Sequence, residues 1–236
     1  MPSNPVQVDV WFLSLDVSPE QLAALTALLS ADEVERADRF HQPLHRQRWI
    51  ASRGQVRQLL AHALGRAPSR IVFEPEAYGR PALAGADQGL PSFNWSHSEG
   101  WGALALSPEA RVGIDIEASR PIGDVDIEYA LSPAERHAMA GLTGAARLEA
   151  FFRFWTLKEA YMKGVGAGAS LPLHDFDMSL EGPGLARLKG APEEPGLWRM
   201  AEAVPVDGWH CAVSARTNGR ALNTTWHRGA AGERAI

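Results

Sequence analysis

The chain has 236 residues, of which 45% are hydrophobic and 22% charged, a composition typical of a soluble globular protein. It excludes a disordered, collagen-like or fibrous chain. The net charge of -5 argues against a protein that binds nucleic acid over its whole surface. We therefore expect no nucleic-acid partner. The single cysteine, Cys211, cannot form an intramolecular disulfide, so we expect a cytoplasmic protein.

The sequence carries no signal of secretion or membrane insertion. Its opening residues, Met-Pro-Ser-Asn-Pro, contain neither a basic segment nor an apolar one. No stretch approaches the ~18 consecutive apolar residues of a membrane-spanning helix. We therefore expect no membrane partner.

The N-terminal part predicts one strand and then helices. Apolar residues alternate with others from Val6 to Phe12, which is the period of a β-strand. Residues 18–21, Ser-Pro-Glu-Gln, offer an N-cap, a proline at the first helical position and a capping-box glutamine. A longer helix is predicted from Leu44 to Leu64, with its end at Gly65. We expect its inward residues to be Trp49, Val56, Leu59, Leu60 and Ala63.

Arginines crowd the region of this long helix. Eight of them lie between residues 36 and 70, against a single acid, Asp38. We expect them on the outer face of the helix, where they would form a cationic surface that attracts phosphates or carboxylates.

The middle of the chain predicts short strands. Runs of β-forming residues alternate there with turn signals rich in glycine, proline and serine. We expect them to form an antiparallel meander. The runs are residues 71–73, 93–95, 102–106 and 112–116.

The C-terminal part predicts a helical region and then strands. A second capping box, Ser-Pro-Ala-Glu, begins at Ser132 and opens a helical pattern that reaches Val165 and a glycine cluster. Residues 182–196 are rich in glycine and proline and predict a surface loop. The strands expected around it are residues 175–180, 198–204 and 209–216.

The order of elements indicates the α+β class, with two halves of similar size. Each half is expected to be a small, mostly antiparallel sheet packed with helices. The midpoint, Ala118, directly follows a predicted strand and precedes a turn-rich connector. We therefore expect domains at residues 1–118 and 119–236, with a ligand site at their interface.

Two acids mark the strand before this midpoint. Asp115 and Glu117 are two residues apart, so both side chains point to the same side of the strand. Adjacent carboxylates repel each other unless a cation lies between them, and Mg²⁺ suits such a pair. The alternative is a polar, solvated strand face.

A second charged pair lies on the predicted later helix. Glu159 and Lys163 are at i and i+4, one turn apart on the same face. A surface ion pair worth about 0.3 to 0.5 kcal/mol is the alternative. The chain has only three lysines, and two of them, Lys158 and Lys163, fall here between an aromatic face and a glycine-rich turn. This setting favours a functional role.

The segment from Asn94 to Ser98 combines hydroxyls, an imidazole and backbone donors, which suits binding of phosphate oxygens. A plain polar turn is the alternative. A Ser-His-acid hydrolase is disfavoured, because Ser96 and His97 point to opposite sides of a strand and no Gly-x-Ser-x-Gly motif is present. The sequence also lacks a Walker loop, a Gly-x-Gly-x-x-Gly turn and a His-Glu-x-x-His motif.

Four motifs, in this order and spacing, closely resemble those of the 4'-phosphopantetheinyl transferases. The likeness is to the larger type, which activates peptide and polyketide synthases. A looser likeness covers residues 36–57, and the C-terminal quarter carries no motif. The motifs are Tyr78-Gly79-Arg80-Pro81, Phe93-Asn94-Trp95-Ser96-His97-Ser98, Gly113-Ile114-Asp115-Ile116-Glu117 and the segment from Phe154 to Gly164.

The resemblance implies transfer of the phosphopantetheine arm of coenzyme A to a serine of an apo acyl or peptidyl carrier protein. Adenosine 3',5'-bisphosphate would be released. It also implies a pseudo-dimeric fold of two similar halves, with coenzyme A between them. Since the two halves already form that interface, we expect a monomer.

The resemblance also implies roles for individual residues. Asp115, Glu117 and Glu159 would hold Mg²⁺ against the diphosphate, and Lys163 would neutralise phosphate charge. Asp115, Glu159 and Lys163 are thus the expected catalytic residues. Glu159 is one candidate for the base that deprotonates the serine, and a water or hydroxide on the metal is the other.

Further residues would bind coenzyme A. Ser96 and His97 correspond to family positions at its phosphates, and Arg48 to an arginine near the 3'-phosphate. Arg80 replaces a lysine common in that turn, which keeps the charge and changes its geometry. Lys163 completes this expected coenzyme A set.

The carrier protein would dock on residues that follow the metal strand and the Lys163 helix. The candidates are equally compatible with core positions. The apolar ones are Ile122, Leu131, Met139, Leu171 and Leu173, and the basic ones are Arg120 and Arg136.

Two other functions stay open from the sequence. One is a non-catalytic protein of the same fold that binds coenzyme A or the carrier. The other is a metal-dependent phosphatase or nuclease that uses the carboxylates and the arginine-rich helix.

Overall fold

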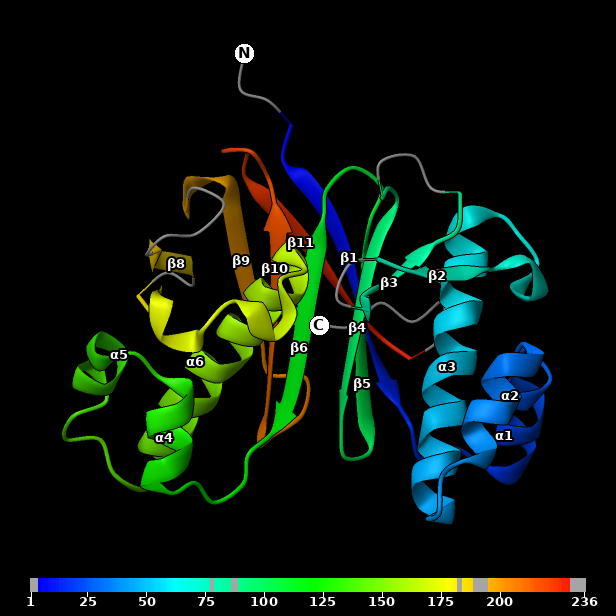
Figure 1. Cartoon of the computed structure of the whole chain (residues 1–236), viewed down its shortest axis with the longest axis horizontal. Coiled ribbons are helices and arrows are strands. Elements are labelled where there is room, and N and C mark those ends of the chain that lie inside the picture. Colours follow the sequence, from blue (N-terminus) through cyan, green and yellow to red (C-terminus); the bar gives the residue numbers. More distant parts are fainter. Residues whose placement is uncertain (1–3, 77–78, 86–88, 182–183, 189–194, 230–236) are drawn as a thin grey trace.

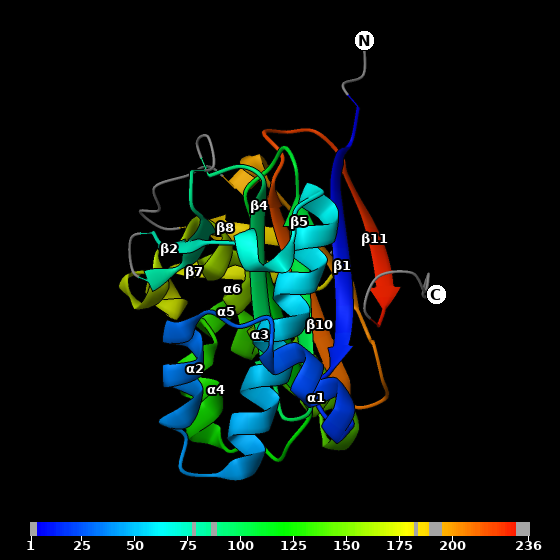
Figure 2. The same cartoon turned by 90° about the vertical axis from the view of Figure 1, so that its right-hand side faces the viewer.

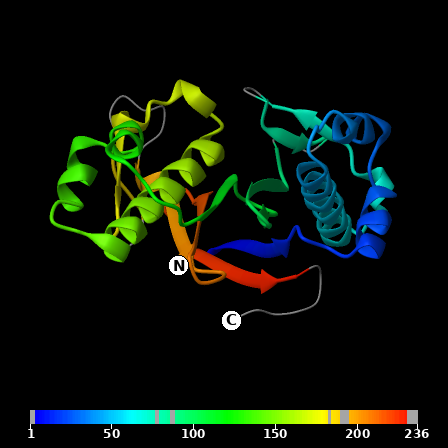
Figure 3. The same ribbon diagram turned by 90° about the horizontal axis from the view of Figure 1, so that it is seen from below.

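The computed structural model contains two lobes with strands between them (Figure 1). It describes residues 4–76, 79–85, 89–181, 184–188 and 195–229, so Tyr78 of the first motif lies outside the described residues. Seen from below, the helices lie on the two outer sides and the strands lie between them (Figure 3). Within the described residues, no helix combines the length and apolar character needed to cross a bilayer.

The first lobe is built on a four-stranded sheet. Its order is β11 (Leu222–Arg228), β1 (Val6–Ser14), β5 (Trp101–Ser107) and β4 (Ser92–Ser98). The β1–β5 and β5–β4 pairs are antiparallel, whereas β11 joins β1 in parallel. Figure 2 shows β11 beside β1, so the last strand of the chain completes the sheet that the first one begins.

Three helices cover one face of this sheet (Figure 1): α1 (Pro19–Thr26), α2 (Ala31–Asp38) and α3 (Pro43–Leu64). The capping box at Ser18 and the left-handed Gly65 that ends α3 confirm the predicted helix limits. The inward prediction is also confirmed for Val56, Leu59 and Leu60, which are buried, while Trp49 is half-buried. It is wrong for Ala63, which is exposed on the far side of the last turn.

The second lobe has a three-stranded antiparallel sheet in the order β6 (Val112–Ala118), β10 (Trp209–Arg216) and β9 (Trp198–Ala203). Helix α6 (Gly144–Val165) packs directly on β6. A Cβ atom at Gly113 would lie 2.1 Å from the carbonyl oxygen of Ala160, so only glycine permits this approach.

Smaller elements complete the lobes. A β2–β3 hairpin (Phe73–Pro75 and Pro81–Leu83) belongs to the first, and a β7–β8 hairpin (Phe176–Ser179 and Gly184–Leu188) to the second. Helices α4 (Asp124–Ala130) and α5 (Pro133–Ala138) lie beside α6, and short 3-10 turns occupy Pro68–Arg70, Gly168–Ser170, Leu173–Asp175 and Pro195–Leu197.

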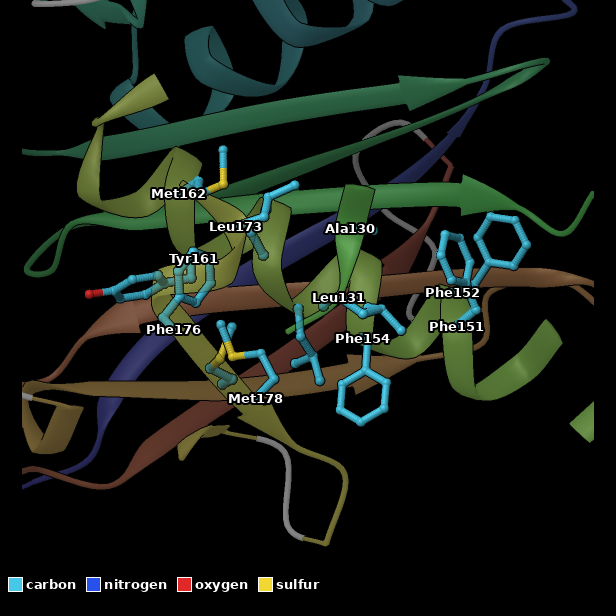
Figure 4. Packing of buried hydrophobic residues seen from close by; sticks show 14 of the residues in the cluster. Ala130, Leu131, Phe151, Phe152, Phe154, Tyr161, Met162, Leu173, Phe176 and Met178 are labelled. Atoms are coloured by element: carbon cyan, nitrogen blue, oxygen red, sulfur yellow. The ribbon is translucent and has the colours of Figure 1, made fainter. Parts of the chain in front are cut away.

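Side chains of α4, α6, β7, β9 and β10, with residues of the connecting segments, form the core of the second lobe (Figure 4). Four of the candidate carrier contacts belong to it, since Leu131, Met139, Leu171 and Leu173 are at most 8% exposed. Ile122 is half-buried against the same cluster. The apolar candidates for carrier contact are therefore core residues. The two basic candidates, Arg120 and Arg136, are exposed.

The α+β class, with small and mostly antiparallel sheets, is confirmed. The predicted meander is confirmed only for β4 and β5. It is wrong at its first run, where β2 pairs with β3 in a separate hairpin, and at its last, where β6 pairs with β10 and not with β5. The connector after residue 118 contains α4, and the pattern from Ser132 to Val165 breaks into two helices because the Gly141 turn lies between them. Part of the predicted 182–196 loop forms β8, and other parts lie outside the described residues. Strand β11 was not expected.

The prediction that the arginines form a cationic surface on the outer face of α3 is also wrong. Arg57 is 3% exposed and binds Glu33 of α2 at 2.7 Å, and Arg53 binds the same carboxylate at 2.5 Å. Arg48 pairs with Asp16 at 2.7 Å. Because these acids come from neighbouring elements, a count of charges along the arginine-rich segment misses them.

The two sheets meet where β4 runs beside β6, and side chains make the connection there. The backbone N–H groups of Val112 and Ile114 donate to Ser92 Oγ at 3.2 Å and to Asn94 Oδ1 at 2.9 Å. Farther along, Ser96 and Ser98 donate to carboxylates of β6. We call Ser92, Asn94, Ser96 and Ser98 the β4 polar row. This row provides hydrogen-bond partners for backbone N–H groups and carboxylates of β6 on the edge that faces β4, where β6 has no strand paired with it through the backbone among the described residues.

A buried ion pair ties α6 to α5 and β7. Lys158 Nζ lies 2.7 Å from Glu135 Oε2 and donates at 2.7 Å to the carbonyl of Phe176. The two charged side chains are 0% and 1% exposed. Glu135 also accepts the N–H groups of Ser132 and Met178, so its charge is well solvated by the protein.

We predict that Lys158→Met lowers the free energy of unfolding by about 3 to 5 kcal/mol, because it leaves the Glu135 charge buried without its partner. Arg153→Met is the matched control. Arg153 lies on the same helix as Lys158, and its pair with Glu202 of β9 is more exposed. Urea unfolding followed by circular dichroism measures both. Equal losses would contradict a special contribution of the buried pair.

Candidate active site between the lobes

A cavity of about 630 Å³ lies between the lobes. Residues of the first lobe that line it come from the segment around β3 and from β4, and those of the second lobe come from α4, α6 and the chain after α6. Polar and charged residues at its wall are Arg80, Asn94, Glu159, Lys163 and His174. The cavity therefore brings residues from three of the four sequence motifs to one place.

Three predicted site residues meet beside this cavity. Lys163 Nζ lies 2.6 Å from Asp115 Oδ1 and 3.0 Å from Ser96 Oγ, and Ser96 donates to the same Asp115 oxygen at 2.8 Å. Burial disfavours the charged form of Lys163, yet the Asp115 carboxylate raises the pKa of the lysine above its usual value. Lys163 therefore carries a firm positive charge at neutral pH.

Asp115 has one oxygen left over. Its side chain is 4% exposed, and Oδ2 is buried with no hydrogen-bond partner among the described residues. A buried carboxylate oxygen without a donor is costly, and a cation or an additional donor would relieve that cost.

Glu117 lies farther along the same face of β6. Its Oε2 accepts from Ser98 Oγ at 2.8 Å and its Oε1 from Trp155 Nε1 at 3.2 Å. Burial, followed by the negative charge of Asp115, raises the pKa of Glu117 despite these two hydrogen bonds. The alternative that these two acids lie on a polar, solvated strand face is therefore wrong for Asp115, which is buried. It describes Glu117 only in part, because that side chain is half-buried.

Glu159 faces the cavity from α6. Burial raises the pKa of its carboxyl group; the charge of Lys163 lowers it, and those of Asp115 and Glu117 raise it further. The surface ion pair with Lys163 does not form, because Lys163 turns to Asp115. Across the described parts of the chain, no group of three or more histidine, cysteine or acidic side chains stands in an arrangement that could hold a metal ion.

Arg80 is directed into the protein. It donates to the carbonyls of Val112 at 2.9 Å and Phe93 at 3.1 Å, and to Ser92 Oγ at 3.0 Å. Burial and the nearby charge of Arg111 lower the pKa of Arg80 to about 10. In this arrangement the guanidinium connects β4 with β6 and contributes only part of its surface to the cavity.

Two further cavities extend the site across the first lobe. A cavity of about 370 Å³ shares Gly79, Pro81 and Trp95 with the first, and one of about 320 Å³ shares Trp49 and His97 with the second. The third is also lined by Arg48, which Asp16 holds through two hydrogen bonds. The three adjoining cavities form a path that we call the interlobe groove.

The structure thus gathers the predicted residues into two places. Asp115, Ser96 and Lys163 are in direct contact, with Glu117 and Glu159 close enough to shift each other's pKa. Arg48 lies at the other end of the interlobe groove. His97 lies between the two places, because it lines the second and third cavities and its pKa is lowered by burial and by the charge of Lys163, against the opposing effect of Asp115. Sequence reasoning placed Ser98 only in a candidate phosphate-binding segment and assigned no role to Trp155, whereas both bind Glu117. The alternation of polar residues along Ser92, Asn94, Ser96 and Ser98 is the signal that could have found the first of them.

Comparison with known proteins places the chain in a family. The family model described as "4'-phosphopantetheinyl transferase superfamily" matches residues 111–214. The model described as "4'-phosphopantetheinyl transferase, N-terminal" matches residues 15–109. The two matches follow each other and together cover most of the chain.

Individual relatives agree with the family models. The chain is 36% identical to the 4'-phosphopantetheinyl transferase HetI of a Nostoc species, over 88% of this chain and 87% of the relative. It is 30% identical to a phosphopantetheinyl transferase of a Thraustochytrium species, over 89% and 79%. A 4'-phosphopantetheinyl transferase of Bacillus subtilis is 32% identical over 68% and 70%. The chain therefore belongs to the 4'-phosphopantetheinyl transferases, in their larger type, and its class is that of a transferase.

The raised pKa of Glu159 gives a pH dependence to stability. A carboxyl whose pKa is higher in the folded chain favours folding while it is protonated, and this contribution is lost as the pH rises through the raised pKa. Glu159→Gln removes the ionisation. We predict that in EDTA it is more stable than the unsubstituted protein near pH 8 and not near pH 4.

Urea unfolding at the two pH values measures this difference. Glu149→Gln is the control, because Glu149 is an exposed glutamate of the same helix. A gain of similar size from both variants near pH 8 would assign the effect to general surface charge and contradict the prediction.

Proposed function

We propose that this protein transfers 4'-phosphopantetheine from coenzyme A to a serine hydroxyl of an apo acyl or peptidyl carrier protein. The observation that carries the proposal is the contact of Lys163 with Asp115 and Ser96 at the wall of the cavity between the lobes. It sets a fixed positive charge beside three carboxylates at the end of a long groove. Family membership supplies the reaction class.

The acidic residues have the chemistry that suits a Mg²⁺ ion, although in this structure their side chains do not form a ready-made group of three ligands. Asp115 offers a buried oxygen without a partner, and the carboxyls of Glu117 and Glu159 have raised pKa values in part because their charges repel. A divalent cation would relieve both costs, and hard oxygen ligands suit Mg²⁺. We propose that Asp115, Glu117 and Glu159 hold the ion, which would supply charge neutralisation for the diphosphate of coenzyme A.

Lys163 and Glu159 have separate tasks in the proposed reaction. Phosphoryl transfer depends mainly on positioning and charge neutralisation. Lys163 donates a hydrogen bond to a phosphate oxygen as negative charge moves to the leaving group. Glu159, whose raised pKa suits a general base, accepts the proton of the attacking serine. A water molecule that takes this proton instead is the alternative left for experiment.

The rest of coenzyme A is proposed to lie along the interlobe groove. His97 and Arg48 line its outer part, and Trp49 and Trp95 also line it. We assign Arg48 to the 3'-phosphate and His97 and Ser96 to the other phosphates, with Ser96 turned toward Asp115 before the ligand binds. Arg80 contributes mainly by holding β4 and β6 together.

The carrier protein is proposed to approach the first cavity from the side of α4, where Tyr129 lines the entrance and is 67% exposed. We also propose that the two halves, 1–118 and 119–236, form one catalytic unit as a monomer in the cytoplasm. The parallel pairing of β11 with β1 supports a single unit, because residues of the second half complete the first sheet.

Intact-protein mass spectrometry tests the transfer directly. An apo carrier incubated with the protein, coenzyme A and Mg²⁺ is expected to gain one phosphopantetheine mass, and EDTA is expected to prevent the gain. Glu159→Ala should abolish the reaction, and Lys163→Met should slow it by about 100-fold. Glu149→Gln serves as the control with full activity. Tight coenzyme A binding without any gain, over several carrier types, would instead indicate a non-catalytic binding protein.

The assignment of Arg48 makes a separate prediction. Arg48→Ala should weaken coenzyme A binding about tenfold, the equivalent of ~1.4 kcal/mol for a lost charge-assisted hydrogen bond. Isothermal titration calorimetry measures it, with Arg46→Ala on the same helix as control, because Arg46 pairs with Asp38 away from the groove. Dephospho-coenzyme A, which lacks the 3'-phosphate, should bind both variants alike. A tenfold loss with that ligand too would contradict the assignment.

A further inference from the structure

Glu117 is held from both lobes at once. The Ser98 hydroxyl of β4 donates to Oε2 at 2.8 Å, and the Trp155 indole of α6 donates to Oε1 at 3.2 Å. Each oxygen of the carboxylate therefore has its own donor, and the two donors come from opposite sides of the lobe junction. Two hydrogen bonds in this arrangement fix the plane and the direction of the carboxylate.

Both donors are themselves held in place. The Trp155 ring stacks on Phe151, with centroids 6.3 Å apart and planes within 10°, and it contacts Tyr129 at 6.3 Å. Ser98 lies in the ladder of β4 opposite Trp101, and its hydroxyl oxygen also accepts the N–H of Ala118 at 3.5 Å. The Trp155 ring cannot turn away from Glu117 without loss of its stacking, and the Ser98 hydroxyl cannot do so without loss of its hydrogen bond from Ala118.

Both donors are also neutral, which distinguishes Glu117 from its neighbour. Lys163 pairs with Asp115 and offsets its charge. The hydroxyl and the indole orient Glu117 without an ion pair, and Arg120 acts on it through its charge without a direct contact. A carboxylate that is fixed in direction and not paired with a cationic side chain is what a divalent cation needs from a ligand.

We propose that Ser98 and Trp155 are positioning residues that orient the Glu117 carboxylate toward a bound divalent cation. This inference rests on the proposed function, because it takes Glu117 as one of the residues that hold the ion. It goes further by assigning the direction of that side chain to one donor from each lobe, so that the cation site is complete only when the lobes are correctly joined.

Binding of Mn²⁺ to the full chain, followed by electron paramagnetic resonance, tests the inference without reference to activity. Trp155→Phe keeps an aromatic ring for the stack on Phe151 and removes the indole N–H, and Ser98→Ala removes the hydroxyl. Each should weaken Mn²⁺ binding about tenfold, as expected when a partner of a metal ligand is lost. Trp101→Phe and Ser179→Ala are the matched controls, because neither side chain contacts the acidic residues.

A double-mutant cycle separates positioning from general damage. In a Glu117→Gln background, Trp155→Phe should have no further effect on Mn²⁺ affinity. Melting in EDTA shows whether each variant is folded, and the stabilisation added by Mn²⁺ should be smaller in the two variants than in the controls. An equal loss of affinity in both backgrounds would overturn the inference.

The failures of the two proposals are distinguishable. If the unsubstituted protein binds Mn²⁺ and modifies a carrier while both variants keep full Mn²⁺ affinity, the positioning role is overturned and the proposed function stands. If the unsubstituted protein binds no Mn²⁺, the metal role of the acidic residues falls, and the positioning role falls with it.

Discussion

The connection between β4 and β6 is the constraint on which the site depends. These strands belong to different sheets, and the β4 polar row joins them through side chains. Side-chain hydrogen bonds are directional, so the row fixes how far one sheet lies along the other. That register brings Ser96 to Asp115 and Ser98 to Glu117. The acidic residues therefore owe their placement to the same contacts that join the lobes.

Negative charge exceeds positive charge at the acidic cluster of this junction. Three carboxylates share the region with one lysine, and the charge of that lysine is already directed to Asp115. Burial, and then the neighbouring negative charges, raise the pKa of the two glutamates, and this costs stability when they are ionised. A cation would remove the cost, which explains why a protein that handles a diphosphate would retain the arrangement.

Local signals in the sequence identified most elements. The capping boxes at Ser18 and Ser132 and the stop at Gly65 are local, so they fixed helix limits correctly. Partners distant in sequence were missed. Nothing local indicates that β6 pairs with β10 or that β11 lies parallel to β1. The same limit explains the arginine-rich helix, since Glu33 precedes the arginine-rich segment and pairs with two of its arginines.

Helix geometry explains why two neighbouring lysines differ in environment. Successive residues are about 100° apart around a helix, so Lys158 and Lys163 are about 140° apart, whereas Glu159 and Lys163 are only about 40° apart. Lys158 therefore faces the core, where Glu135 receives it, and Lys163 faces the cavity together with Glu159. The buried pair holds α6 at one rotation about its axis. Because that rotation also directs Glu159, Lys163 and Trp155, a structural ion pair in the second lobe determines where the charges of the junction point.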